Sequence, residues 1–146
     1  MAVEIEHKYL VVNDSYRSMA TGSCRLAQGY VCREPERTVR VRTGDDKGWL
    51  TIKGTTVGDT RMEFEYEIGL KDAEQLLELC VGRIVRKTRY FVPFDGRVWE
   101  VDEYEGELAP LVVAEIELPD SGCKYQLPPF VGANVTGDPR YYNSNL

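Results

Sequence analysis

The sequence predicts an α+β fold that is mainly β and built from antiparallel strands. Eight segments alternate apolar and charged residues with the two-residue period of a strand whose faces meet different surroundings. Gly, Pro and Asp stand in most of the short connections between these segments, as expected for turns. Only two stretches show helical spacing. A chain of 146 residues has the size of one domain, so we expect residues 1–146 to form a single one.

Turn-forming residues separate the expected strands. Glu34-Pro35-Glu36 follows the second strand and Thr43-Gly44-Asp45-Asp46 follows the third. Gly58-Asp59 precedes the fifth strand, and Pro93-Phe94-Asp95-Gly96 precedes the seventh. The eight expected strands cover residues 3–11, 26–33, 37–43, 48–54, 61–68, 85–92, 97–104 and 111–118.

Two short helices are expected between the strands. The first covers residues 14–20, with Asp14 as a suitable N-cap and Gly22 beyond its end. The second covers residues 71–80, and its apolar residues recur at helical spacing. From Pro128 onward the chain has no long period, so we expect short helical turns there. The apolar positions of the second helix are Ala73, Leu76, Leu77 and Cys80.

Most expected strands carry charges of one sign on one face. Adjacent acidic side chains on a face repel each other unless a cation lies between them, and adjacent basic side chains attract an anion. Together they are typical of a site for a metal-bound phosphate chain, since divalent cations prefer carboxylate oxygens while Arg and Lys bind phosphate oxygens. The alternative is a sheet face that simply lies in water. The groups are Arg40/Arg42, Lys87/Arg89, Glu63/Glu65/Glu67, Glu100/Asp102 and Glu115/Glu117.

The order of these charged groups resembles that of a known family. Glu4-x-Glu6-x-Lys8 is similar to the ExExK signature of the CYTH superfamily, the triphosphate tunnel metalloenzymes. Val135 to Asn143 resembles the corresponding part of its small bacterial, tripolyphosphatase-like members. Further matches follow in family order over essentially the whole chain: Gln28-Gly29-Tyr30, Arg40-x-Arg42, Lys53, Arg61-x-Glu63-x-Glu65, Lys87-Thr88-Arg89-Tyr90, Asp102 and Glu115-x-Glu117.

The resemblance implies that the eight antiparallel strands close into a barrel, a tunnel with a charged interior and flanking helices. Closure removes exposed strand edges, and a barrel of this size has room for one small ligand. The residue pattern alone leaves open a sandwich with a charged outer face. In the barrel, the apolar side chains would face outward beneath the helices, namely Val39, Val41, Phe64, Tyr66, Tyr90 and Ile116.

The resemblance also implies an activity, the metal-dependent hydrolysis of a triphosphate. Its simplest substrate is inorganic tripolyphosphate, cleaved to diphosphate and phosphate, with nucleoside triphosphates as secondary substrates. Lys8 is the candidate for polarising the attacked phosphoryl group, with Tyr30 beside it. The candidates for binding the triphosphate are Arg40, Arg42, Lys53, Lys87 and Arg89. The candidates for holding one or two Mg²⁺ or Mn²⁺ ions are Glu4, Glu6, Glu63, Glu65, Asp102, Glu115 and Glu117.

Other interpretations stay open at this stage. An adenylate cyclase or a thiamine triphosphatase would share the superfamily, and a non-catalytic polyphosphate- or nucleotide-binding protein would share the scaffold. Tyr30 fits a position in the hydrophobic core beside a strand as well as a position in the site. Arg61 and Glu67 equally fit solvent-exposed positions at strand ends. His7, the only histidine, shares the apolar face of its strand with Ile5, so we expect no catalytic role for it.

The composition narrows the classes of molecule that we expect this protein to bind. The net charge of −6, from 24 acidic and 18 basic residues, argues against a nucleic-acid surface. Four cysteines without a CxxC pair suggest free thiols in a reducing cytosol. No apolar run reaches membrane length, so we expect a cytoplasmic protein with no membrane partner. The partner is then a small-molecule triphosphate, and the resemblance also suggests a homodimer.

Overall fold

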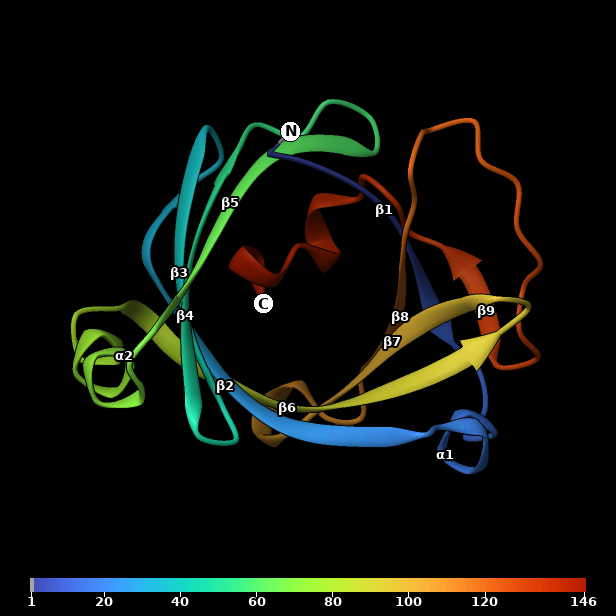
Figure 1. Ribbon diagram of the computed structural model, residues 1–146, viewed down its shortest axis with the longest axis horizontal. Helices are drawn as coiled ribbons and strands as arrows, with labels where there is room; N and C mark the ends of the chain where they lie inside the picture. Colours follow the sequence, from blue (N-terminus) through green and yellow to red (C-terminus); the bar gives the residue numbers. More distant parts are fainter. Residues whose placement is uncertain (1) are drawn as a thin grey trace.

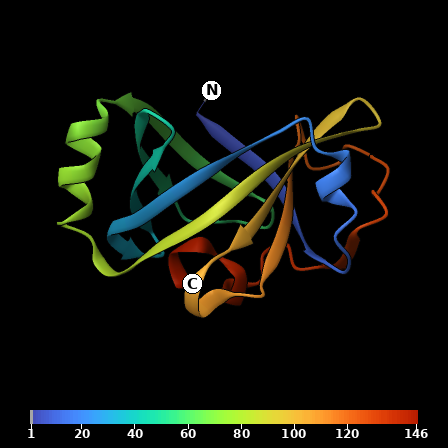
Figure 2. The same cartoon turned by 90° about the horizontal axis from the view of Figure 1, so that it is seen from below.

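The computed structural model describes residues 2–146 and shows a closed ring of antiparallel strands around a lumen (Figure 1). The strands are β1 (Val3–Val11), β2 (Gly22–Glu34), β3 (Arg37–Gly44), β4 (Lys47–Gly54), β5 (Thr60–Ile68), β6 (Val81–Phe94), β7 (Arg97–Tyr104), β8 (Val112–Glu117) and β9 (Val131–Asn134). Two α-helices, α1 (Tyr16–Met19) and α2 (Leu70–Leu77), lie on opposite sides outside the ring (Figure 2). Three 3₁₀ turns complete the structure, η1 (Gly106–Leu108), η2 (Pro139–Tyr141) and η3 (Asn143–Asn145).

The barrel closes where the first strand meets the fifth. The strand order is β5-β4-β3-β2-β6-β7-β8-β1, and β1 also pairs with β5. This seam is short and joins Val3, Glu4 and Ile5 to Met62, Arg61 and Thr60, respectively. The expected eight-stranded antiparallel barrel is therefore confirmed, and the sandwich is excluded.

The chain adds a strand that the sequence pattern did not indicate. β9 pairs with β1 through Tyr9 and Val11, next to the barrel proper. Its four residues, Val131–Asn134, include a glycine and show no charged alternation, so only the neighbouring strand makes them extended. The turns η2 and η3 confirm the short helical turns expected in the same region.

Several boundaries differ from those expected. β2 begins at Gly22 and β6 at Val81, each four residues earlier than the alternation indicates. Pairing of these two strands with each other extends both of them, from Gly22 with Phe91 to Tyr30 with Val81. The helices are also shorter than expected: α1 spans four residues and α2 spans eight.

The larger hydrophobic cluster lies outside the barrel, between the strands and the segments that cover them, and a smaller one around Val85, Tyr104 and Val113 lies on the lumen face. Trp99, Val101 and Ile116 are almost fully buried in one cluster on the outer face. Tyr16 of α1 packs edge-on against Tyr90 of β6, with the ring centroids 5.4 Å apart. This placement confirms that apolar side chains such as Tyr90 and Ile116 face outward and are covered.

The outward-facing side chains of β5 are not covered by a helix as expected. Phe64 and Tyr66 face outward but remain 36% and 57% exposed. α2 contacts β2, β3 and β4, where it covers Val41, and its eight residues do not reach across β5. Val39 is half-buried. No helix among residues 2–146 is long and apolar enough to span a membrane.

The contact between α2 and the barrel depends on a glycine. A methyl group at Gly48 of β4 would lie 2.4 Å from the Cβ of Ala73, which is fully buried. We predict that Gly48→Ala lowers the free energy of unfolding by about 1–3 kcal/mol, because the helix must move outward. Gly54→Ala on the same strand is the matched control, since its methyl group would lie 3.6 Å from Met62, an ordinary contact. Urea denaturation measures both, and equal stability of the two variants would contradict this account of the packing.

Candidate active site

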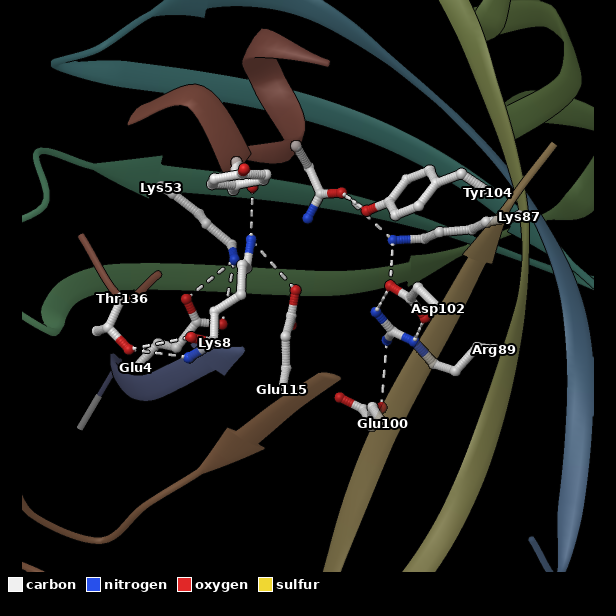
Figure 3. Close-up of polar contacts among 12 residues, drawn as sticks. Glu4, Lys8, Lys53, Lys87, Arg89, Glu100, Asp102, Tyr104, Glu115 and Thr136 are labelled. Carbon is white, nitrogen blue, oxygen red and sulfur yellow. Dashed lines mark hydrogen bonds and ion pairs between the residues drawn. The ribbon is translucent and has the colours of Figure 1, made fainter. Parts of the chain in front are cut away.

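One face of the barrel strands fills the lumen with charged side chains (Figure 3). β1 contributes Glu4, Glu6 and Lys8 on alternate positions, as the strand period requires. The closed wall removes many of these groups from solvent. The buried charged residues are Glu4, Lys8, Arg40, Arg42, Lys87, Arg89, Asp102 and Glu115. The sequence had placed every one of them in the candidate site.

Lys53 of β4 forms ion pairs with carboxylates of two other strands, β1 and β5. Its Nζ lies 3.0 Å from Oε1 of Glu4 and 3.2 Å from Oε2 of Glu63. Burial raises the pKa of Glu4, and its ion pair with Lys53 only partly offsets that effect. The ammonium group thus occupies the position between two carboxylates that a cation would otherwise take.

Asp102 is the centre of the second charged cluster. Its carboxylate accepts hydrogen bonds from Nζ of Lys87 at 2.7 Å and from Nε and Nη2 of Arg89 at 2.8 and 2.9 Å. Burial alone would raise the pKa of Asp102, but the two positive charges hold that pKa well below its usual range. Burial also lowers the pKa of Lys87 to about 7, with repulsion from Arg89 adding to the effect. Glu100 pairs with Arg89 at 3.2 Å on the side away from Lys87.

Lys8 forms a third group. Its Nζ lies 3.3 Å from Oε1 of Glu115 and donates a hydrogen bond to the carbonyl oxygen of Tyr141 at 2.9 Å. Burial alone would lower the pKa of Lys8, but the nearby carboxylates raise it, so this ammonium keeps its charge. Tyr30 is 8% exposed and lines the same cavity as Lys8.

Two buried guanidinium groups, those of Arg40 and Arg42, lack a carboxylate partner among residues 2–146. Arg42 donates to Oε1 of Gln28 at 3.0 and 3.1 Å, and Arg40 donates to Thr51 at 3.3 Å. Nε of Arg40 and Nε2 of Gln28 are buried donors without an acceptor in the same part of the chain. Burial and repulsion from the other guanidinium groups lower the pKa of Arg42 to about 10. These donors are arranged for an anion.

Glu6 is the carboxylate counterpart of these arginines. Within residues 2–146 its carboxylate forms no hydrogen bond or ion pair, although it points into the lumen. Burial and repulsion from Glu115 and Glu4 raise the pKa of Glu6 to about 8. Burial likewise raises the pKa of Glu117. An all-oxygen set of this kind fits a hard divalent cation, although no three acidic, His or Cys side chains among the described residues are close enough to hold one ion as they stand.

The lumen contains two cavities of different size. The larger, of about 290 Å³, is lined by Arg40, Arg42 and Arg89 on one side and by acidic residues on the other. The smaller, of about 60 Å³, is lined by Lys8 and Tyr30. A water molecule needs at least about 10–15 Å³ on this scale, so the smaller cavity suits a few waters and the larger suits a small ligand. The acidic residues of the larger cavity are Glu4, Glu6, Glu63, Glu65, Glu100, Glu115 and Glu117.

Not every expected site residue reaches a cavity. Lys87 and Asp102 are 0% and 1% exposed and lie behind the cavity walls, where they pair with each other. Glu67 lies on the surface, 3.7 Å from Lys47, as expected for a solvated strand end. Arg61 lies at the start of β5, but its side chain lines the smaller cavity instead of being simply solvated.

The structure adds contacts that the residue pattern did not indicate. The C-terminal turns η2 and η3 lie inside the ring of strands (Figure 1), and Asn143 of η3 lines both cavities. Its Oδ1 accepts hydrogen bonds from the hydroxyl of Tyr104 and from Nζ of Lys87. Gln28 could have been found from its parity with Tyr30 in the same motif. Asn143 could not, because only long-range contacts bring its segment into the lumen.

Comparisons with known proteins agree on one family. The sequence model of the CYTH domain matches residues 2–142. An inorganic triphosphatase of Acetivibrio thermocellus is 49% identical over 147 residues, covering 100% of this chain and 94% of the relative. An inorganic triphosphatase of Nitrosomonas europaea is 33% identical, covering 98% of this chain and 95% of the relative. A solved structure of an inorganic triphosphatase superposes with a TM-score of 0.68 at 31% identity, covering 99% of this chain and 94% of the other.

The unpaired Glu6 gives the metal-free protein a defined pH dependence. Its pKa is raised from 4.5 to about 8, so its protonated form contributes stability that is full below about pH 4.5 and is lost as the pH rises through 8. We predict that Glu6→Gln, which stays uncharged, becomes increasingly more stable than the wild type between pH 5 and 8. Glu74→Gln, exposed on α2, is the control and should show no such trend.

Urea denaturation in chelator-containing buffer at several pH values measures this difference. A constant stability difference between Glu6→Gln and the wild type across the range would contradict the raised pKa of Glu6.

Proposed function

This chain belongs to the CYTH domain family, and on that premise we propose that it hydrolyses inorganic triphosphate to diphosphate and phosphate with the help of a divalent cation. The proposal is carried by the larger cavity, in which buried guanidinium groups without carboxylate partners face unpaired carboxylates. An anion alone would leave the acidic wall repelled, and a cation alone would leave Arg40 and Arg42 unmatched. A metal-bound triphosphate matches both walls.

The basic residues would bind the triphosphate by exchanging partners. Arg40 and Arg42 bind first, because no carboxylate has to be displaced. Lys53 then turns from Glu4 and Glu63 toward the phosphates, which frees both carboxylates. Phosphoryl transfer requires mainly positioning and neutralisation of charge, and a fixed array of donors supplies both without reorganisation.

The carboxylates would hold the cation in the same cavity. Glu4, Glu6 and Glu115 supply oxygen ligands from β1 and β8, and Glu63, Glu65 and Glu117 extend the acidic wall. We assign Asp102 to orienting Lys87 and Arg89, since it lies behind the cavity. A bound Mg²⁺ or Mn²⁺ would neutralise phosphate charge and lower the pKa of a coordinated water.

Lys8 and Tyr30 would act at the smaller cavity. The charged ammonium of Lys8 can polarise the phosphoryl group that is attacked, and the Tyr30 hydroxyl can orient a water in the adjoining space.

We further propose a single domain over residues 1–146, a cytoplasmic location and a homodimer. Size-exclusion chromatography tests the homodimer directly.

Metal dependence is the first test. We predict that phosphate release from tripolyphosphate stops in excess chelator and returns with Mg²⁺ or Mn²⁺. The melting temperature of the wild type should rise when the metal is added alone, and Glu6→Gln should lose most of that rise. A panel of diphosphate, ATP and thiamine triphosphate distinguishes the superfamily's other activities, and binding without turnover would indicate a non-catalytic protein. Undiminished hydrolysis in chelator would refute the metal's role.

Lys53 provides the test of substrate binding. We predict that Lys53→Ala lowers kcat/KM for tripolyphosphate by about two to three powers of ten, because a preorganised positive charge is lost from the site. Lys47→Ala is the matched control on the same strand, since Lys47 pairs with Glu67 on the surface, and its kcat/KM should stay at the wild-type value. Steady-state kinetics per folded molecule measures both variants. Equal values for them would place Lys53 outside the site.

A further inference from the structure

β1 has no partner strand along part of one edge within the described residues. Its pairing with β5 ends at Ile5, and its pairing with β9 begins at Tyr9. The residues between them are Glu6, His7 and Lys8, which include two charged groups of the proposed site. The barrel wall at this point is therefore not a continuous sheet.

Two connecting segments complete the wall. The β4–β5 connection, residues 55–59, brings in Asp59, whose carbonyl oxygen accepts a hydrogen bond from the amide of Glu6 at 3.2 Å. The segment after β9 brings in Thr136, whose hydroxyl accepts a hydrogen bond from the amide of Lys8 at 3.0 Å (Figure 3). The backbone of β1 is thus satisfied here by loops rather than by a strand.

His7 holds one of these loops from the outer side of the wall. Its Nε2 donates to Oδ2 of Asp59 at 2.8 Å, and its Nδ1 shares a hydrogen bond with the hydroxyl of Tyr125 at 2.5 Å. Ser121 donates to the other carboxylate oxygen of Asp59 at 2.7 Å. The hydrogen bonds from His7 and Ser121 lower the pKa of Asp59 to about 2, so the carboxylate stays charged. Both ring nitrogens of His7 thus take part in hydrogen bonds, one with Asp59 and one with Tyr125.

The loop that His7 holds forms part of the smaller cavity. Gly58 and Asp59 line this cavity together with Glu6 and Lys8. Its volume of about 60 Å³ is enough for a few ordered waters. Charges act far more strongly on a reacting group in such a space than in open water. A loop that moved away would open this side of the cavity.

We propose that His7 is a positioning residue, which through Asp59 holds residues 55–59 against β1 and keeps this wall of the cavity beside Glu6 and Lys8 in place during hydrolysis. The inference rests on the proposed triphosphatase function. Two of the groups proposed to bind the triphosphate, Arg40 and Lys53, also line this cavity. Their side chains are held by Thr51, Glu4 and Glu63 and not by residues 55–59. Loss of the His7–Asp59 contact should therefore lower kcat and leave KM nearly unchanged.

The test uses His7→Phe and Asp59→Ala, which each remove the contact. We expect kcat to fall about tenfold or more in both, as for other groups that orient a site indirectly, with KM for tripolyphosphate within about twofold of the wild type. The double variant should be no slower than the slower single variant, because the contact that His7→Phe removes is already absent in Asp59→Ala. Amide hydrogen exchange of residues 55–59 should accelerate in all three.

Tyr125→Phe is the matched control. It removes the other hydrogen bond of His7 but leaves His7 in contact with Asp59, so kcat and exchange of residues 55–59 should stay at wild-type values even if the melting temperature falls. His7→Gln retains an N–H donor and should recover part of kcat. If His7→Phe does not fold, Asp59→Ala and His7→Gln carry the test.

Three results would overturn the proposal. These are wild-type kcat per folded molecule in His7→Phe and Asp59→Ala, an equal loss of kcat in Tyr125→Phe, and faster exchange of the loop without a change in kcat. Failure of the triphosphatase function itself would be recognised separately, because the wild type would then release no phosphate.

Discussion

The structure depends on mutual neutralisation of charges that a closed barrel has removed from water. Ionised groups are costly to bury unless they are paired, and the lumen contains both signs on facing strands. Lys53 between Glu4 and Glu63, and Asp102 between Lys87 and Arg89, satisfy this constraint internally. Where pairing is incomplete, at Arg40, Arg42 and Glu6, the excess charge of each sign defines what the site can bind. Stability and binding are therefore two uses of one charge pattern.

The same constraint moves most of the hydrophobic core to the outside of the barrel. Because most of the lumen is polar, burial of apolar surface comes largely from the outer faces, which α1, α2 and the loop before β9 cover unevenly. Trp99 and Val101 are fully buried there, whereas Tyr66 on β5 stays exposed. The short covering elements thus determine which strands are stabilised by apolar packing on their outer faces. Strands whose outer faces remain exposed are held mainly by the hydrogen bonds to their neighbouring strands.

Residue alternation was sufficient to predict the strands and the direction of most charged side chains. Parity on β1 assigned Glu4, Glu6 and Lys8 to one face and His7 to the other, and the structure agrees. Closure came from the family resemblance, because a period of two specifies faces but not which strands pair. β9, Asn143 and the His7–Asp59 contact could not be predicted, since each depends on partners at least 39 residues away in the chain. The exposure of Tyr66 depended on helix length, which was overestimated for α2.

The position of β1 in the strand order has a consequence for folding. This strand precedes all others in the chain, but its partners β5, β8 and β9 begin at residues 60, 112 and 131. Contacts between such distant residues form slowly, because a long loop must close before any of them is gained. Until then β1 is an unpaired edge with two carboxylates and an ammonium. Those charges, which later serve the lumen, also make the waiting strand a poor template for aggregation.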